Sequence, residues 1–352
     1  MTPLLQADAV TKVFGGGLMQ REKTIALRNF TFTVGDTPPT ITGIVGESGS
    51  GKSTMARLLL GLEQPSAGAV CYRGKDLRQL TSVERRTFRT DVQAVFQDPF
   101  EVFNSVYHVD HVLNVPIRKF GLARSKAESR QLIEEVLQAV GLRSDETLGR
   151  YPHQLSGGQR QRVMVARALL LKPKLIIADE PVSMIDASLR AAVLTSLRQL
   201  RDQFGISLIY ITHDLTTAFQ ICDDIIVLYR GGVAEAGRAE QIVKQPQHPY
   251  TQLLVGSIPR PDPDKLWPEE PTPSTAAANA KAEQGCLFAA RCPHTFAPCL
   301  EKAPPFFRMA ERQAATCYLY QEAPTLPFAE MDRLLKGGEQ RENKAIADVT
   351  KS

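Results

Sequence analysis

Short apolar runs, separated by stretches with helical spacing, set the pattern of this chain of 352 residues. Three runs stand out: Leu175–Ala178, Ser207–Thr212 and Ile225–Leu228. Runs of this length are typical of strands that are buried on both faces of a parallel sheet. Helical patterns lie between them, including Ser188–Gln203, and strands that alternate with helices predict a doubly wound α/β sheet.

The N-terminal part has a different pattern. Apolar residues alternate within residues 3–34, on either side of glycines 15–17, which predicts antiparallel strands joined by a turn. The next elements are predicted as a loop at Gly35–Thr40, a buried strand at Ile41–Val45, helices at Ser53–Leu62 and Thr81–Arg89, and a strand at Asp91–Phe96.

Composition changes along the chain and indicates its domains. Residues 132–142 repeat apolar positions at helical spacing and stop at a glycine, so we expect a helical insertion in this region. Residues 259–284 are rich in Pro, Ala, Thr and Glu, which is typical of an exposed linker. We therefore predict a main domain at 1–258 with a helical subdomain at about 99–165, a cysteine-containing region at 259–335, and a disordered tail at 336–352.

Overall charge and hydropathy exclude some classes of protein. The chain is 43% hydrophobic and 23% charged, and its 42 basic and 38 acidic residues give a net charge of +4. This balance argues against an obligate nucleic-acid binder. No apolar run approaches the ~20 residues that cross a bilayer, and the first residues lack the pattern of a secretory signal. We expect a cytoplasmic protein that can still bind a membrane partner.

One segment matches the phosphate-loop pattern G-x-x-x-x-G-K-[ST]. It runs from Gly46 to Ser53, between a predicted strand and a predicted helix, which is the context that the motif requires. Its backbone N–H groups and the helix N-terminus favour phosphate oxygens. Lys52 is expected to reach the β and γ phosphates of ATP, and Ser53 to ligate Mg²⁺. The predicted nucleotide-binding residues here are Gly46, Ser48, Gly49, Ser50, Gly51, Lys52, Ser53 and Thr54.

Two carboxylates follow the buried strand at residues 175–178. The strand is expected to deliver Asp179 to the Mg²⁺ ion, while Glu180 can polarise a water for in-line attack on the γ-phosphate. An acidic strand end is common by itself, but the phosphate loop upstream favours the catalytic interpretation.

The segment Leu155–Arg162, with the sequence LSGGQRQR, resembles the signature of the ATP-binding cassette ATPases, the motor subunits of ABC transporters. The resemblance implies a P-loop NTPase fold, with a RecA-like parallel core sheet, N-terminal antiparallel strands and a helical subdomain. It also implies that the signature closes over the γ-phosphate held by a second cassette. The residues concerned are Ser156, Gly157, Gly158 and Gln159.

Other elements of this family occur in the expected order, and the resemblance covers residues 3–258. Gln97 matches the Q-loop glutamine, which senses Mg²⁺ and the membrane partner, and Asp186 lies in a segment that resembles the D-loop. His213 matches the switch histidine that contacts the γ-phosphate. Phe14 matches the aromatic residue that stacks on adenine.

Further motifs resemble the oligopeptide/dipeptide importer subfamily, whose members also transport nickel, sugars or opine-like compounds. They are Phe96–Pro99, His248–Leu254, Ile258–Pro259 and Gly285–Pro293. The resemblance implies a second ATPase subunit in a heterodimer or homodimer, two transmembrane permease subunits and an extracytoplasmic solute-binding protein. It places the chain peripherally on the cytoplasmic face of the inner membrane.

Four of the six cysteines lie within 32 residues, with the spacing C-x5-C-x6-C-x17-C. Clustered cysteines in a cytosolic chain favour metal binding over disulfides, and the absence of a C-x2-C pair makes a zinc finger a poor fit. Four thiolates can hold a [4Fe–4S] cluster, as the subfamily resemblance implies; zinc and free thiols stay open. All nucleotide residues lie upstream, so hydrolysis is expected to survive loss of the cluster. The predicted ligands are Cys286, Cys292, Cys299 and Cys317.

Two functions from different classes fit these motifs. The first is an ATP-hydrolysing importer subunit that drives uptake of peptides or a related solute. The alternative is a soluble ABC ATPase that acts on nucleic acid or ribosomes, which would predict two cassettes in one chain or a basic arm. We favour the first and expect no nucleic-acid partner.

Overall fold

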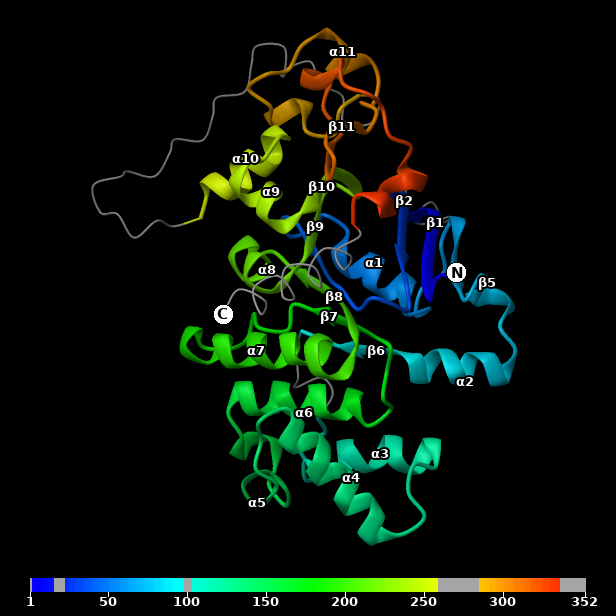
Figure 1. Ribbon diagram of the computed structural model, residues 1–352, viewed down its shortest axis with the longest axis vertical. Helices are drawn as coiled ribbons and strands as arrows, with labels where there is room; N and C mark the ends of the chain where they lie inside the picture. Colours follow the sequence, from blue (N-terminus) through cyan, green and yellow to red (C-terminus); the bar gives the residue numbers. More distant parts are fainter. Residues whose placement is uncertain (1, 16–22, 98–102, 259–284, 336–352) are drawn as a thin grey trace, which may run out of the picture. The chain divides into compact units, whose positions relative to one another are not determined.

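The structure is a computed structural model that describes residues 2–15, 23–97, 103–258 and 285–335 (Figure 1). Contacts divide the chain into two units, described here separately. Unit 1 comprises residues 1–79 and 212–352, and unit 2 comprises residues 80–211. The predicted linker at 259–284, the predicted tail at 336–352 and part of the predicted glycine turn lie outside the described residues.

The first sheet of unit 1 is antiparallel, as the alternating pattern predicted. Its order is β2-β1-β4-β5. The β4–β5 hairpin was not predicted; its two-residue turn is Arg73-Gly74, with φ angles of 49° and 79°. Two positive φ angles are the mark of a type I′ turn, which suits the twist of a hairpin. The strands are β1 (Leu5–Phe14), β2 (Thr24–Val34), β4 (Ala67–Tyr72) and β5 (Lys75–Asp76).

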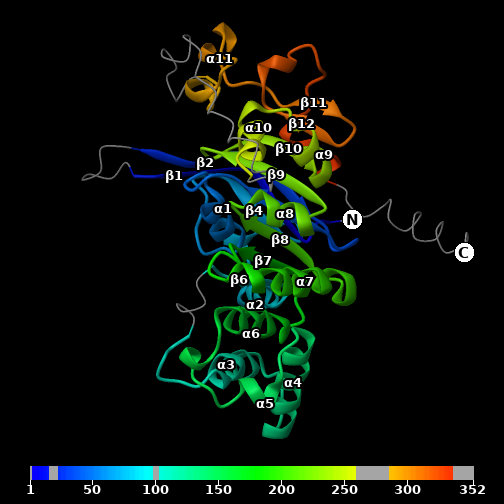
Figure 2. The same cartoon turned by 90° about the vertical axis from the view of Figure 1, so that its left-hand side faces the viewer.

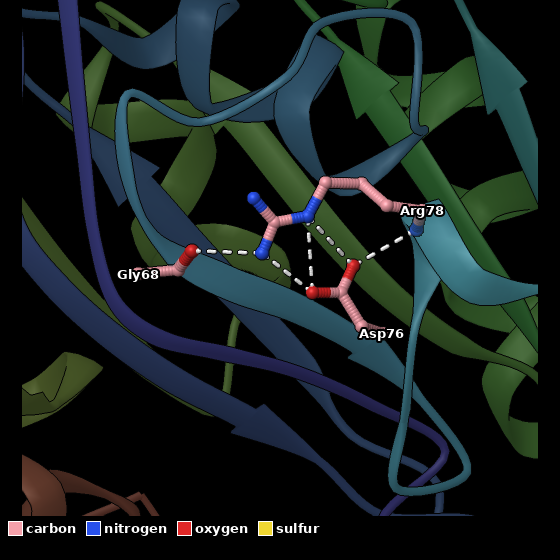
Figure 3. Close-up of polar contacts among 3 residues, drawn as sticks. All are labelled: Gly68, Asp76 and Arg78. Atoms are coloured by element: carbon pink, nitrogen blue, oxygen red, sulfur yellow. Dashed lines mark hydrogen bonds and ion pairs between the residues drawn. The ribbon is translucent and has the colours of Figure 1, made fainter.

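An ion pair fixes the end of this hairpin (Figure 3). The Asp76 carboxylate accepts hydrogen bonds from the backbone N–H of Arg78 at 2.8 Å and from its Nη2 at 2.6 Å. Arg78 Nη2 also donates to the carbonyl oxygen of Gly68 at 3.4 Å. The Arg78 side chain lowers the pKa of Asp76, so the pair stays ionised at neutral pH.

The second sheet of unit 1 has the strand order β11-β12-β10-β9-β3. The predicted strands β3 (Ile41–Val45) and β9 (Asp224–Tyr229) pair in parallel and are buried throughout. The other pairs are antiparallel, so the C-terminal region extends the sheet of the cassette. These unpredicted strands are β10 (Gly232–Arg238), β11 (Phe307–Ala310) and β12 (Gln313–Ala315).

Helices of unit 1 pack on these sheets. Helix α1 (Lys52–Leu59) packs on β1 and β2, and α8 (Leu215–Ile221) packs on β3 and on α9 (Ala239–Lys244). Two further helices belong to the C-terminal half of the unit. They are α10 (Pro249–Gly256) and α11 (Ala297–Glu301).

Unit 2 contains the three parallel strands β8, β7 and β6, in that order, and a group of helices (Figure 2). Helices α3 and α4 pack on each other and on α6, and α6 also packs on α7 and β6. The helix predicted at 132–142 begins earlier, after the N-cap residue Ser125. Along the described parts of the chain, no helix is long and apolar enough to span a bilayer. The elements are α2 (Ser82–Asp91), β6 (Val92–Val95), α3 (Asp110–Phe120), α4 (Lys126–Ala139), α5 (Ser144–Thr147), α6 (Gly157–Leu169), β7 (Leu175–Asp179), α7 (Ala187–Phe204) and β8 (Ser207–Thr212).

Candidate nucleotide-binding site

The phosphate loop of unit 1 joins β3 to the N-terminus of α1, as predicted. Gly51, the N-cap of α1, has a φ of 103°, and a Cβ atom built on it would lie 2.2 Å from the carbonyl oxygen of Ala26. A Cβ on Gly46 would lie 2.2 Å from the carbonyl oxygen of Leu228. Glycine is therefore required at both ends of the loop. The loop leads into the positive end of a helix, which favours an anion.

Two side chains of the loop are suited to phosphate. Lys52 is 7% exposed, and its Nζ donates to the carbonyl oxygens of Gly46 at 2.7 Å and Glu47 at 2.9 Å. Ser50 Oγ is buried and has no hydrogen-bond partner among the described residues. A buried hydroxyl without a partner is costly, so a ligand oxygen would satisfy it. Ser53 is exposed in the first turn of α1, beside the half-buried Thr54.

Phe14 and His213 also belong to unit 1. Phe14 ends β1 with 41% of its surface exposed, and the Lys12 ammonium lies 4.9 Å from the centre of its ring. The exposed part of the ring that Lys12 does not cover can stack on a base. His213 is exposed directly after β8, before the N-cap residue Asp214 of α8.

Unit 2 brings two of the predicted Mg²⁺ ligands to one sheet edge. Val95 of β6 pairs with Ala178 of β7 in a parallel register. Asp179 therefore ends β7 and Gln97 lies just beyond the end of the neighbouring β6, at the carboxyl ends of the strands, where α/β proteins commonly bind ligands.

Glu180 has an unusual backbone conformation that the sequence does not reveal. Its φ is 50°, and its side chain is 8% exposed. The backbone N–H donates to the carbonyl oxygen of Ile211 at 2.8 Å, and the carbonyl accepts from Ser183 Oγ at 3.0 Å. A left-handed conformation in a non-glycine residue costs about 1–3 kcal/mol and is frequent at functional sites.

The signature segment forms the N-terminus of α6. Ser156 Oγ accepts from the backbone N–H of Gln159 at 3.2 Å, and Gln159 Oε1 accepts from the N–H of Ser156 at 2.9 Å. This capping box fixes the first turn of the helix. A Cβ on Gly157 would lie 3.3 Å from the carbonyl oxygen of Met184, and Gly158 faces Ile185. The start of α6 therefore packs against the D-loop segment, which ends at the exposed Asp186.

The four clustered cysteines line one small cavity of about 10 Å³, at the lower limit of the volume that one water molecule requires. All six cysteines lie in the described part of the chain and are free thiols. Burial raises the pKa of Cys286 to about 11 and that of Cys317 to about 12, and it also raises the pKa of Cys292. Metal ligands must be thiolates.

The predicted iron–sulfur site thus receives no support from the structure. Among the described residues, no group of three or more His, Cys, Asp or Glu side chains is arranged to hold a metal ion. The spacing in the sequence correctly indicated that the four thiols line a common cavity, in which Cys292, Cys299 and Cys317 are buried and Cys286 is half-buried.

The sequence did not point to two residues that bind Glu47 of the phosphate loop, Tyr250 and Arg291. Tyr250 lies in the His248–Leu254 motif and Arg291 in the Gly285–Pro293 motif. Both motifs carried the subfamily resemblance, yet no spacing rule could show that they reach the loop.

Family models match both parts of the chain. The model described as ABC transporter matches residues 27–183, and the model described as oligopeptide/dipeptide transporter, C-terminal region, matches residues 234–299. The fold and the phosphate loop therefore define an ABC ATPase.

Individual relatives extend this result. YkfD of Bacillus subtilis, named as an oligopeptide transport ATP-binding protein, is 37% identical over 331 residues, which is 92% of this chain and 97% of the relative. The oligopeptide transport ATP-binding protein OppF of Escherichia coli is 39% identical over 283 residues, 78% of this chain and 82% of the relative. The chain belongs to the oligopeptide/dipeptide branch of the ABC transporter ATP-binding family.

A solved structure agrees with the fold. The dimeric ATP-binding cassette MJ0796 in a post-hydrolysis state with ADP and Pi aligns with a TM-score of 0.58 and 29% identity. The alignment covers 67% of this chain and 98% of that one. The prediction of an ABC cassette is confirmed.

Proposed function

We propose that this chain is the ATP-hydrolysing subunit of an ABC importer that takes up peptides through separate permease subunits. The observation that carries the proposal is the extent of the relationship to YkfD. The match runs over 331 residues and so includes both the cassette and the region with four cysteines. Nickel, sugars and opine-like compounds are the other solutes that the subfamily resemblance allows.

The phosphate loop would hold the triphosphate of ATP. Lys52 would leave the loop carbonyls to bind the β and γ phosphates, and Ser50 Oγ would gain the partner that it lacks. Phe14 would stack on adenine. Mg²⁺, held by Ser53, Gln97 and Asp179, would neutralise phosphate charge.

Glu180 would act as the catalytic base. Its carboxylate accepts a proton from the attacking water, whose oxygen forms a bond to the γ-phosphorus while the bond to the β–γ bridging oxygen breaks. ADP and inorganic phosphate leave. His213 would contact the γ-phosphate and Gln97 would help to orient the site. The left-handed conformation of Glu180 supports this role, because such strain concentrates at working residues.

Each site would be completed by the signature of a second cassette. Ser156, Gly157, Gly158 and Gln159 lie at the N-terminus of α6, whose positive end suits the γ-phosphate. Asp186 of the D-loop would lie near the same interface. The second cassette would be a different ATPase subunit or another copy of this chain.

The remaining partners would be two permease subunits and an extracytoplasmic solute-binding protein. Their association would hold the chain on the cytoplasmic face of the inner membrane. We also propose, on the strength of the subfamily resemblance, that the four cysteines bind a [4Fe–4S] cluster, which would require the small cavity that their thiols line to open. Measuring the iron, sulfide and zinc content of the purified protein would distinguish a cluster from zinc and from free thiols.

Reconstitution tests the transport function. The chain would be placed in proteoliposomes with the permeases and the binding protein from its own operon, and uptake of a radiolabelled tripeptide would be measured with ATP. We expect uptake with the wild-type chain and none with Glu180→Gln. Uptake of nickel or a sugar, with no uptake of the peptide, would show that the importer transports that solute instead. Co-sedimentation with ribosomes, without ATP-dependent uptake of any solute, would favour the nucleic-acid alternative.

A further inference from the structure

Every polar group of Glu47, the second residue of the phosphate loop, makes a hydrogen bond. Its backbone N–H donates to the hydroxyl of Tyr250 at 2.9 Å. Its two carboxylate oxygens accept from Nη1 of Arg291 at 3.1 and 2.9 Å. Its carbonyl accepts from Lys52 Nζ at 2.9 Å and from the N–H of Ser50 at 3.2 Å. The C-terminal part of the chain thus fixes the N–H and the carboxylate of Glu47, while Lys52 binds its carbonyl oxygen.

Tyr250 is a rigid support for the loop. It is fully buried, and its ring centre lies 4.5 Å from that of Tyr229 and 5.5 Å from that of Phe288. Its backbone N–H donates to Nδ1 of His248 at 3.0 Å, which caps α10. Burial raises the pKa of Tyr250, so its hydroxyl remains neutral while it accepts from Glu47.

Arg291 is positioned by the segment that carries the cysteines. It ends a short 3₁₀ helix, Ala289–Arg291, between Phe288 and Cys292. The Ala289 N–H donates to the carbonyl of Cys286 at 3.0 Å, and Thr295 Oγ1 donates to the carbonyls of Ala289 and Cys292 at 2.6 and 3.1 Å. The backbone around two of the thiols therefore determines where the guanidinium lies.

The negative charge of Glu47 connects its ion pair with Arg291 to the binding of phosphate. A carboxylate in a loop that binds a triphosphate repels the ligand, and Arg291 neutralises that carboxylate. Both side chains are 38% exposed, so the ion pair adds little to the stability of the fold. Its main effect is expected on the loop.

We propose that Arg291 and Tyr250 are positioning residues of the phosphate loop, and that through them the cysteine-containing segment sets the affinity for ATP. The inference rests on the proposed function, because it requires that the loop binds ATP. Arg291 acts by neutralising Glu47, and Tyr250 acts by holding the Glu47 backbone. Neither residue takes part in the chemical step.

The test is calorimetric binding of a non-hydrolysable ATP analogue, AMP-PNP, with Mg²⁺ to the full chain. Arg291→Ala should weaken binding about fivefold, since it leaves the Glu47 charge uncompensated. Arg291→Lys should recover part of the loss, and the double variant Arg291→Ala/Glu47→Gln should recover most of it. Tyr250→Phe should also weaken binding, since it removes the acceptor for the Glu47 N–H but keeps the ring.

Arg333→Ala is the matched control, because Arg333 forms an exposed ion pair with Glu330 in the same C-terminal region. It should bind AMP-PNP like the wild type. Equal affinity of Arg291→Ala and the wild type for AMP-PNP would overturn this inference but leave the proposed function intact. A loss that Glu47→Gln does not reverse, with a parallel fall in Tm, would also overturn it, since only a structural role would remain. A wild-type chain that binds no nucleotide would overturn both the inference and the proposed function.

Discussion

Arg312 and Asp224 form an ion pair between the turn that joins β11 to β12 and the first residue of β9. Arg312 Nη2 lies 2.7 Å from Asp224 Oδ1, and the Asp224 side chain has no exposed surface. Asp224 Oδ2 is buried without a hydrogen-bond partner among the described residues. The pair ties the C-terminal hairpin to the core sheet, at the cost of burying a carboxylate that is only half satisfied.

This arrangement predicts a pH dependence of stability. Burial raises the pKa of Asp224 to about 7, against the opposing effect of Arg312. The folded state then binds a proton more tightly than the unfolded state, whose aspartate pKa is about 3.9. Between about pH 4 and 7 the contribution of Asp224 to the free energy of unfolding falls as pH rises, by up to about 1.4 kcal/mol per pH unit, and above pH 7 it is constant.

Chemical denaturation of wild type and Asp224→Asn at several pH values checks this prediction. The difference between the two profiles isolates Asp224, because the buried groups Glu235 and His248 are present in both proteins. The wild type should lose stability relative to the variant between pH 5 and 7. Parallel profiles would show that the pKa of Asp224 is not raised.

Hydrolysis should depend on Glu180. Glu180→Gln keeps the shape of the side chain and removes the charge that accepts the proton. ATP should still bind, turnover should fall by a factor of about a hundred or more, and a closed dimer should accumulate on gel filtration with ATP. Near-normal turnover would rule out Glu180 as the catalytic base.

Lys52→Ala should weaken nucleotide binding itself. The variant removes a charged donor to phosphate, and hydrogen bonds that involve a charge contribute about 1.5–3 kcal/mol, which corresponds to roughly a ten- to hundredfold loss of affinity. Lys244→Ala is the control, because Lys244 is 62% exposed and pairs with Glu240 on α9. Unchanged affinity and turnover in Lys52→Ala would show that this is not the working phosphate loop.

The catalytic site should be shared between chains. If the chain forms a homodimer, an equal mixture of Lys52→Ala and Ser156→Arg should restore about a quarter of the wild-type turnover, since about half of the dimers are mixed and one of the two sites in each mixed dimer is intact. Turnover of the wild type alone should fall on dilution. High turnover per molecule that is independent of concentration would contradict a shared site.

Metal analysis of anaerobically purified protein tests the cysteine region. We expect iron and sulfide in about equal amounts, with a broad absorbance at about 400 nm. Cys292→Ser should lose the iron, the sulfide and the absorbance. Stoichiometric zinc in colourless protein would show that the four cysteines bind zinc instead of a cluster. Four titratable thiols without metal would rule out a metal site, in agreement with the small volume of the cavity in the structure.

Local features of the chain were predictable because they depend on near neighbours. The phosphate loop lies between β3 and α1 as expected, since short apolar runs and a glycine pattern act over a few residues. The unpredicted strands after Arg73-Gly74 and Arg230-Gly231 had a local signal too. In each pair a glycine occupies the second position of the turn, and both residues have the positive φ angles that a two-residue hairpin turn requires.

The sequence by itself determined the class of protein, the nucleotide motifs and the existence of four associated cysteines. Only the tertiary structure decided what surrounds them. Glu47 meets Tyr250 and Arg291 across 203 and 244 positions of sequence, and no periodicity encodes contacts of that range. Hydrolysis is expected to survive loss of the cluster because the catalytic residues lie upstream, and this stays a prediction, since order along the chain does not limit contact in space. Folding places Arg291 beside the phosphate loop because the 3₁₀ helix Ala289–Arg291 and the hydrogen bonds of Thr295 fix the backbone that carries it.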